Sequence, residues 1–150
     1  EIASCLVGSE MCIRDSNRPM LATGTGTDLQ PIELDLSRFA IQIVKPPILI
    51  PTKEAYASLI PAQPCTPLYE RIRKPVIYWQ QGIINNFEPS IFTKHPAIKA
   101  IKQAMIDAGA VYASMTGSGS AVYGLWERDN LADLPSEITR DCTIFSANMQ

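Results

Sequence analysis

The sequence predicts an α+β fold, because strand-like runs are mixed with helical segments and two of the runs should form a hairpin. The segments FAIQIVKPPILI, VYASM, AVYGLW and CTIFSANM are rich in β-forming residues, whereas HPAIKAIKQAMIDAG has apolar residues at helical spacing. Only TGSGS separates VYASM from AVYGLW, so these two runs should be neighbouring strands. This hairpin favours α+β over a doubly wound parallel sheet.

The composition is that of a globular domain rather than a disordered tail. Hydrophobic residues make up 46% of the chain and charged residues 19%, and 150 residues are enough to bury one core. The formal net charge is -2, and no segment gathers lysines and arginines. Nucleic acid is therefore not an expected partner.

The cysteines and the single histidine argue against structural zinc. The four cysteines include no CxxC pair, and His95 cannot complete a Cys/His set at a usual spacing. No apolar run approaches the about 18 residues of a membrane span, and no signal peptide pattern is present. We therefore expect no membrane span, reduced thiols and a cytoplasmic protein.

Residues 1–16 differ in character from the remainder of the sequence. They show neither strand nor helix periodicity, and the string LVGSEMCIRDS resembles a translated sequencing-adaptor read. We expect a foreign, adaptor-derived segment over 1–16, packing poorly, and a domain over 17–150. A genuine N-terminal strand is the alternative.

The first half of the domain should contain a hairpin, a strand and a short helix. MLATGTGTDLQPIEL gives two extended runs around a turn at Gly24 and Gly26. A strand is expected over 39–44, because proline cannot donate to a sheet and Pro46 to Pro51 should continue as an extended edge or loop. Thr52 can then cap a helix that runs through Tyr56 and Leu59.

The second half should begin with a loop and continue with helices. Four prolines between 61 and 75 favour a surface loop, and helical signals resume near Val76. The clearest helix has Pro96 in its first turn and Gly109 at its end. Its apolar face should pack on the sheet, and it consists of Ile98, Ile101, Met105 and Ala108.

The segment TGSGS has the composition of a phosphate-binding loop. Gly117 and Gly119 allow backbone conformations in which N–H groups converge on an anion, and Thr116, Ser118 and Ser120 add hydroxyl groups. A plain turn between strands is the alternative reading. The dinucleotide fingerprint and the Walker loop are both excluded, because the required glycine and lysine positions hold other residues.

The run NNFEPSIFTKHPAIKAIKQAMIDAGAVYASMTGSGSAVYGLW resembles the third conserved motif region of GHMP-family small-molecule kinases. Two upstream segments, NRPMLATGTGTDLQPI and IVKPPILIPTKEAYASL, resemble the inter-domain hairpin and a following segment of the members that act on diphosphocytidyl-methylerythritol. The resemblance covers Asn17 to about Trp126 in the family's order. It implies a GHMP kinase C-terminal domain, with a ferredoxin-like antiparallel sheet and helices packed on one face.

The resemblance also implies a function. These kinases use ATP, with Mg²⁺ in the full-length enzyme, to phosphorylate a hydroxyl of diphosphocytidyl-methylerythritol in non-mevalonate isoprenoid (terpenoid) synthesis. Residues Gly117, Ser118, Gly119 and Ser120 would then shape the phosphate pocket. Tyr56 would lie against the cytosine, with Thr52 beside it. Core packing of Tyr56 and helix capping by Thr52 remain the alternatives.

Some features depart from the family pattern. The family writes Asn-Asp-Phe/Leu-Glu where this chain has Asn85, Asn86, Phe87 and Glu88, so we interpret this group as structural capping and helix anchoring. The catalytic groups of the family lie mainly in its N-terminal half, and Gly8 and Glu10 match that half only by coincidence. We therefore assign no catalytic or metal-binding residue and expect a fragment that is inactive alone.

Two other functions stay open. One is another GHMP kinase, of homoserine or mevalonate-pathway type, from which Tyr56 would distinguish this chain. The other is a non-catalytic α+β module that binds a small molecule. The DNA sequence upstream of Asn17 would decide between a fragment and a module.

Overall fold

The computed structural model describes residues 19–24, 28–57 and 66–149. The chain divides into two compact units, residues 1–35 and residues 36–150. The predicted foreign segment over 1–16 lies outside the described residues, as does Leu59.

The first unit contains the expected hairpin. Strand β1 (Met20–Thr23) pairs with β2 (Asp28–Pro31) in antiparallel register, with Met20 opposite Pro31 and Thr23 opposite Asp28. Gly24 follows β1 with a φ of 63°, a conformation that glycine adopts without steric penalty. The two extended runs around a glycine turn are thus confirmed.

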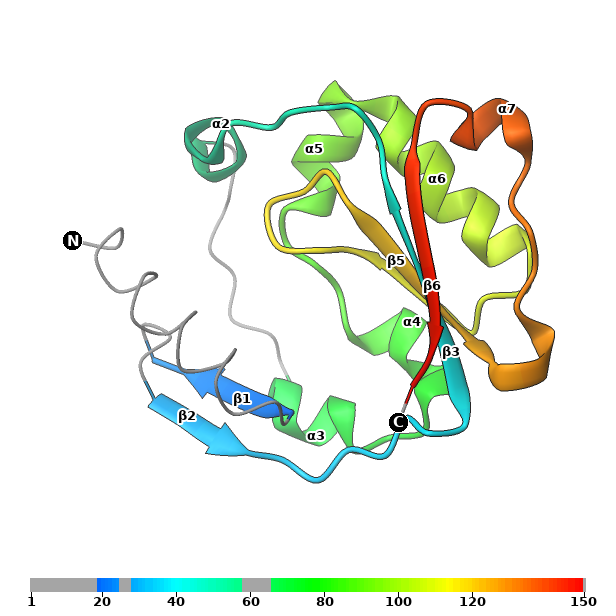
Figure 1. The fold of residues 1–150 in the computed structure, drawn as a ribbon. Helices are drawn as coiled ribbons and strands as arrows, with labels where there is room; N and C mark the ends of the chain where they lie inside the picture. Colours follow the sequence, from blue (N-terminus) through cyan, green and yellow to red (C-terminus); the bar gives the residue numbers. More distant parts are fainter. Residues whose placement is uncertain (1–18, 25–27, 58–65, 150) are drawn as a thin grey trace. The chain divides into compact units, whose positions relative to one another are not determined.

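The second unit is built on a four-stranded antiparallel sheet (Figure 1). Its strands are β3 (Phe39–Lys45), β4 (Tyr112–Met115), β5 (Val122–Glu127) and β6 (Thr143–Asn148). Their spatial order is β4-β5-β3-β6. Helices connect the first strand to the second and the third to the fourth, so the topology is ferredoxin-like and the predicted α+β class is confirmed.

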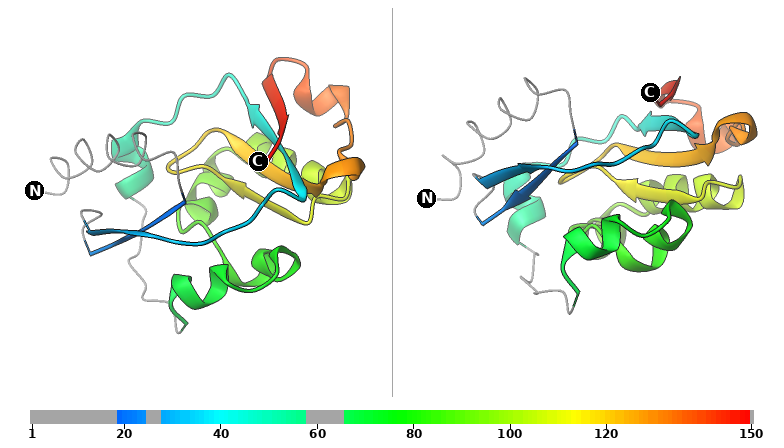
Figure 2. Two further views of the ribbon diagram at one scale, coloured as in Figure 1. Left: turned by 60° about the horizontal axis from the view of Figure 1, so that its bottom comes forward. Right: turned by 90° about the horizontal axis from the view of Figure 1, so that it is seen from below.

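Short helices occupy most of the connections in the second unit. They are α2 (Thr52–Ala57), α3 (Leu68–Ile72), η1 (Val76–Tyr78), α4 (Trp79–Gly82), α5 (Glu88–Lys94), α6 (Pro96–Asp107), η2 (Arg128–Asn130) and α7 (Ser136–Thr139). Figure 2 shows the sheet edge-on, with α4, α5 and α6 on one face. On β3 the residues that face these helices alternate with half-buried ones. This arrangement matches the expected layering.

The core lies between α6 and the sheet. Ile98, Ile101 and Met105 are fully buried, as the helical spacing predicts, and they pack in one cluster with Trp126. Gly124 leaves room for that indole, because a Cβ at Gly124 would lie 2.6 Å from Trp126 Cζ3. The Trp126 indole thus fills the space that a side chain at position 124 would occupy.

Two predictions about helix boundaries need correction. The proline-rich stretch over 61–75 contains the helix α3, which starts directly after Pro67 because proline is tolerated at a helix start. Thr52 is the first residue of α2 rather than its cap. Pro51 occupies the cap position, since its carbonyl accepts a hydrogen bond from Ala55 N at 3.2 Å.

Candidate functional site

The glycine-rich loop joins the ends of β4 and β5, as the sequence predicts. Gly119 N donates to Thr116 O at 2.9 Å, and Thr116 N donates to Ala121 O at 2.8 Å. Gly117 has a φ of 49° and Gly119 a φ of 97°, both in the left-handed region that favours glycine. The tight loop between neighbouring strands is therefore confirmed, and its role in binding phosphate stays a prediction.

The two glycines of the loop have different surroundings. A Cβ at Gly119 would lie 2.7 Å from Ile50 Cδ1 and 2.9 Å from Met115 Sδ, whereas a Cβ at Gly117 would meet no atom within 4 Å. Gly119 is thus required by both its φ angle and the space around it. Gly117 is required by its φ angle alone.

Asn85 holds the start of this loop. Its Nδ2 donates to Met115 O at 2.7 Å and to Gly117 O at 2.8 Å, while its Oδ1 accepts from Phe87 N at 2.9 Å. One amide side chain thus ties the turn before α5 to the end of β4. Asn85 thus anchors the start of α5, but it does not cap the helix as predicted: the N-cap residue is Phe87, without a side-chain cap hydrogen bond.

Glu88 is 5% exposed and binds the outer edge of β4. Its Oε1 accepts from Met115 N at 2.8 Å and from Ser114 Oγ at 3.1 Å, and its Oε2 lies 2.6 Å from Lys102 Nζ. β4 is an outer strand of the sheet, so these side-chain acceptors replace a neighbouring strand. The anchoring role predicted for Glu88 is confirmed.

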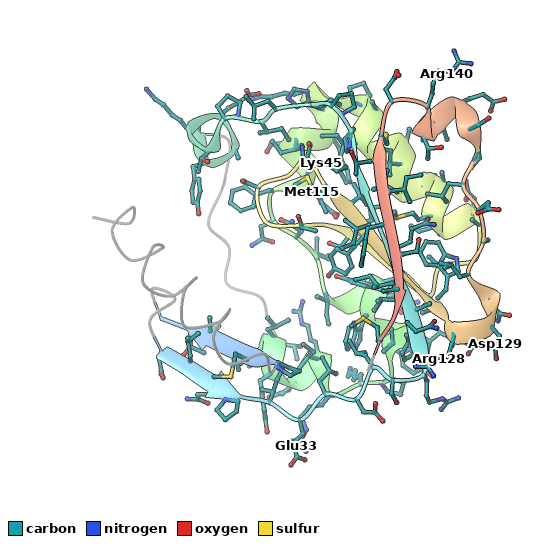
Figure 3. All side chains as sticks on the ribbon, in the orientation of Figure 1. Glu33, Lys45, Met115, Arg128, Asp129 and Arg140 are labelled. Carbon is teal, nitrogen blue, oxygen red and sulfur yellow. The ribbon has the colours of Figure 1, made fainter. Side chains whose placement is uncertain are left out.

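The other end of the loop is held by Ser120 and Lys45. Ser120 is 1% exposed, and its hydroxyl donates to Ile48 O. Lys45 Nζ donates to Ser120 Oγ at 2.6 Å and to Ile48 O at 3.2 Å. Figure 3 labels Lys45 and Met115 at this end of the sheet.

Lys45 is not among the functional residues predicted from the sequence. The available signal was a cation at the end of a predicted strand, directly before two prolines. That signal gives no partner, because Ser120 is 75 residues away in the chain. Only the antiparallel pairing of β3 with β5 brings the two residues together.

Helix α2 carries the residues expected near the cytosine. The Tyr56 side chain is 40% exposed, and its ring centroid lies 5.1 Å from that of Phe87 at an interplanar angle of 75°. Thr52 is exposed at the start of the helix. Tyr56 therefore contacts Phe87, which packs against the core, without being buried itself, and a binding role for Tyr56 and Thr52 stays a prediction.

Charged side chains connect α2 to the junction of α5 and α6. Glu54 Oε1 lies 3.5 Å from Lys94 Nζ and 3.6 Å from His95 Nε2. The Glu54 and Lys94 side chains are 34% and 41% exposed, so water screens their attraction. On its buried side, α2 is anchored by Ala55.

The glycine loop and the predicted substrate-binding residues of α2 belong to one region of the second unit. Ile50, in the segment that leads to α2, packs against Gly119, and Phe87, which contacts Tyr56, is two residues from Asn85. In Figure 1 the loop between β4 and β5 extends toward the side on which α2 lies. The structure thus assembles the glycine loop and α2 around the same connecting segments.

The groups with raised pKa values lie away from this loop. Burial raises the pKa of Tyr112 and of Tyr123 in the sheet, and burial also raises the pKa of Cys142. All three therefore stay protonated near neutral pH. Within the described residues, no group of three or more His, Cys, Asp or Glu side chains is placed to hold a metal ion, and no helix could cross a membrane.

Comparison with known proteins identifies the class of this domain. Residues 76–142 match the family of GHMP kinase C-terminal domains. The chain therefore carries a GHMP kinase C-terminal domain, and the predicted resemblance is confirmed.

Curated relatives give a more specific indication of the kind of kinase. The chain is 41% identical over 128 residues to the 4-diphosphocytidyl-2-C-methyl-D-erythritol kinase of Parabacteroides distasonis, an alignment that covers 85% of this chain and 47% of the relative. It is 42% identical over 127 residues to the kinase of the same name from Bacteroides thetaiotaomicron, with 85% and 46% covered. The chain thus spans about half the length of the curated relatives it matches.

Two crystal structures share the fold. A 4-(cytidine 5'-diphospho)-2C-methyl-D-erythritol kinase superposes with a TM-score of 0.69 at 23% identity, over 89% of this chain and 50% of the other. The homoserine kinase of Cytophaga hutchinsonii superposes with a TM-score of 0.58 at 17% identity, over 85% and 47%. These two superpositions support the ferredoxin-like architecture.

Proposed function

We propose that this chain is the C-terminal half of an ATP-dependent kinase that phosphorylates a hydroxyl group of 4-diphosphocytidyl-2-C-methyl-D-erythritol. The observation that carries the proposal is the 41% identity, over 85% of the chain, to a relative of that name. The reaction is a step of non-mevalonate isoprenoid synthesis, and we place it in the cytoplasm. The N-terminal half, which the relatives have and this chain does not span, would supply the catalytic groups.

In this proposal the glycine loop holds phosphate oxygens of ATP. The positive φ angles of Gly117 and Gly119 turn the backbone sharply, as in other anion-binding loops. Gly119 N is bonded to Thr116 O, so the amides of Gly117 and Ser118 and the Ser118 hydroxyl are the donors we assign to phosphate. Ser120 supports the loop instead of binding phosphate, because its hydroxyl donates to Ile48 O.

Bound ATP supplies the phosphoryl group, and Mg²⁺ would neutralise its developing charge. The described residues hold no acidic cluster suited to a metal, so we assign the Mg²⁺ ligands to the N-terminal half. The chain's own contribution is to position phosphate through the loop and to position the second substrate through α2.

The cytosine end of the substrate is assigned to Tyr56. Its ring forms a T-shaped pair with Phe87 and is partly exposed, which leaves ring surface for stacking on a base. Thr52 lies one helical turn before Tyr56 on α2 and is also exposed. This aromatic position favours a nucleotidyl substrate over homoserine or mevalonate.

The test is to join residues 17–150 to the N-terminal half of the Parabacteroides distasonis relative. The joined protein should phosphorylate diphosphocytidyl-methylerythritol in an ATP-dependent reaction, measured by mass spectrometry of the product. The 150-residue chain alone should show no turnover, because a loop cannot by itself orient the hydroxyl and stabilise the transition state. A folded joined protein that phosphorylates homoserine instead would overturn the assignment.

The isolated chain provides a second check. If it consumed ATP in a substrate-dependent way, and the Gly119→Val chain did not, the catalytic groups would lie within these 150 residues. That result would contradict the proposal that the N-terminal half supplies the catalytic groups.

A further inference from the structure

Lys45 directs its ammonium group into the protein. The group lies 2.6 Å from Ser120 Oγ, 3.2 Å from Ile48 O and 3.4 Å from Pro46 O. An ammonium group has three N–H donors, so these three oxygens can accept all of them. Lys45 is thus a centre of hydrogen bonds, although its residue as a whole is exposed.

The acceptors of Lys45 belong to two different parts of the candidate site. Ser120 is in the glycine loop, whereas Ile48 belongs to the segment that leads to α2. Ser120 Oγ also donates to Ile48 O, and beside this contact Ile50 packs on Gly119. A cation that bonds to both segments strengthens the connection between the glycine loop and the segment that leads to α2, since charge-assisted hydrogen bonds are about twice as strong as neutral ones.

We propose that Lys45 is a positioning residue that couples the glycine loop to α2. Through Ser120 it fixes the loop assigned to phosphate, and through Ile48 it fixes the chain entering the helix that carries Tyr56. The inference deepens the proposed function, on which the catalytic meaning of the coupling rests. The coupling itself is a property of the chain that can be measured without activity.

The direct test is amide hydrogen exchange in the 150-residue chain. Two amides report on the two segments: Gly119 N, bonded to Thr116 O, and Ala55 N, bonded to Pro51 O. In Lys45→Met both should exchange about tenfold faster, because the buried Ser120 Oγ and the carbonyl of Ile48 lose a charged donor. Core amides of α6 should keep their rates and so show that the variant is folded.

Matched variants sharpen this test. Lys99→Met removes the same charge from an exposed position on α6 and should leave both reporter amides unchanged. Lys45→Arg should retain most of the protection, because the guanidinium also donates several hydrogen bonds. The double variant Lys45→Met/Ser120→Ala should accelerate exchange by less than the two single variants together, as expected for residues in one hydrogen-bond network.

Two results would overturn the inference. One is a Lys45→Met chain in which both reporter amides exchange as in the parent. The other is faster exchange at Gly119 alone, since that would leave α2 independent of Lys45. Both results are informative whatever the catalytic outcome.

The catalytic consequence is tested in the joined protein. Lys45→Met should raise KM for ATP and for diphosphocytidyl-methylerythritol together, each about tenfold, with a smaller change in kcat, and Lys45→Arg should restore both. Unchanged values of both KM would contradict the catalytic part of the inference. A parent joined protein without any turnover would instead contradict the proposed function, and the exchange experiment would still decide the coupling.

Discussion

The glycine loop and helix α2 are held in place by different means. The loop is supported by Asn85 and by Glu88, which is 5% exposed, through hydrogen bonds to the end of β4. Helix α2 has six residues, and its ion pair to Lys94 joins side chains that are 34% and 41% exposed. A helix of this length is not stable by itself in water, so α2 depends on its contacts with the remainder of the domain.

This difference matches the roles proposed for the two regions. The loop assigned to ATP is built into the sheet, where its geometry is fixed by buried hydrogen bonds. The helix assigned to the base is attached by Ala55, the Tyr56–Phe87 contact and the segment bonded to Lys45. We therefore expect substitutions near the loop to affect folding, and substitutions on α2 to act locally.

The largest effect is expected for Glu88→Gln. The substitution keeps an acceptor for Met115 N but leaves Lys102 without its carboxylate partner in a site where both side chains are largely buried. Loss of one partner of a buried ion pair should reduce the free energy of unfolding by about 3 kcal/mol. Urea denaturation followed by circular dichroism measures this change.

Glu137→Gln is the matched control for Glu88→Gln, because it makes the same change at an exposed position on α7. It should alter the free energy of unfolding by less than about 0.5 kcal/mol. Equal effects of the two substitutions would show that the Glu88 anchor is not a major source of stability.

A smaller effect is expected for Gly119→Ala, with Gly117→Ala as its partner. Both place a side chain at a positive φ, which should reduce the free energy of unfolding by about 1 kcal/mol. Gly119→Ala should lose about 1 kcal/mol more, because its methyl would press on Ile50 and Met115. Thermal unfolding of the two variants measures the difference, and equal losses would rule out close packing at Gly119.

The smallest effect is expected for Glu54→Gln on α2. Because the Glu54–Lys94 pair is partly exposed and screened by water, the substitution should change the free energy of unfolding by less than about 1 kcal/mol. Hydrogen exchange should nevertheless become faster at Ala55, while amides of α6 keep their rates. A loss of stability as large as that of Glu88→Gln would show that α2 is integral to the core.

Much of the architecture could be predicted from the sequence. The strands over 39–44 and around the glycine loop, and the helix from Pro96 to Gly109, follow from apolar periodicity and from glycine and proline positions. The anchoring role of Asn85 and Glu88 was also predicted. The strands and the helix depend on local sequence pattern, and the role of Asn85 and Glu88 follows from the order and spacing of motifs shared with the family.

Other features depend on tertiary contacts that a linear reading does not contain. The Lys45–Ser120 bond requires the pairing of β3 with β5, and the crowding at Gly119 requires Ile50 to fold over the loop. Helix α3 forms within a proline-rich stretch because Pro67 precedes the helix instead of interrupting it. The ligand roles of Gly117 to Ser120, Thr52 and Tyr56 stay predictions.

The most direct test of the account is steady-state kinetics of the joined protein with ATP and diphosphocytidyl-methylerythritol varied separately. Tyr56→Ala should raise KM for diphosphocytidyl-methylerythritol by about tenfold or more and leave KM for ATP near the parent value, because stacking on one base is worth about 1–3 kcal/mol. Gly119→Ala should act mainly on ATP. If Tyr56→Ala raised only KM for ATP, or if both variants matched the parent, the assignment of α2 to the base and of the loop to phosphate would be wrong.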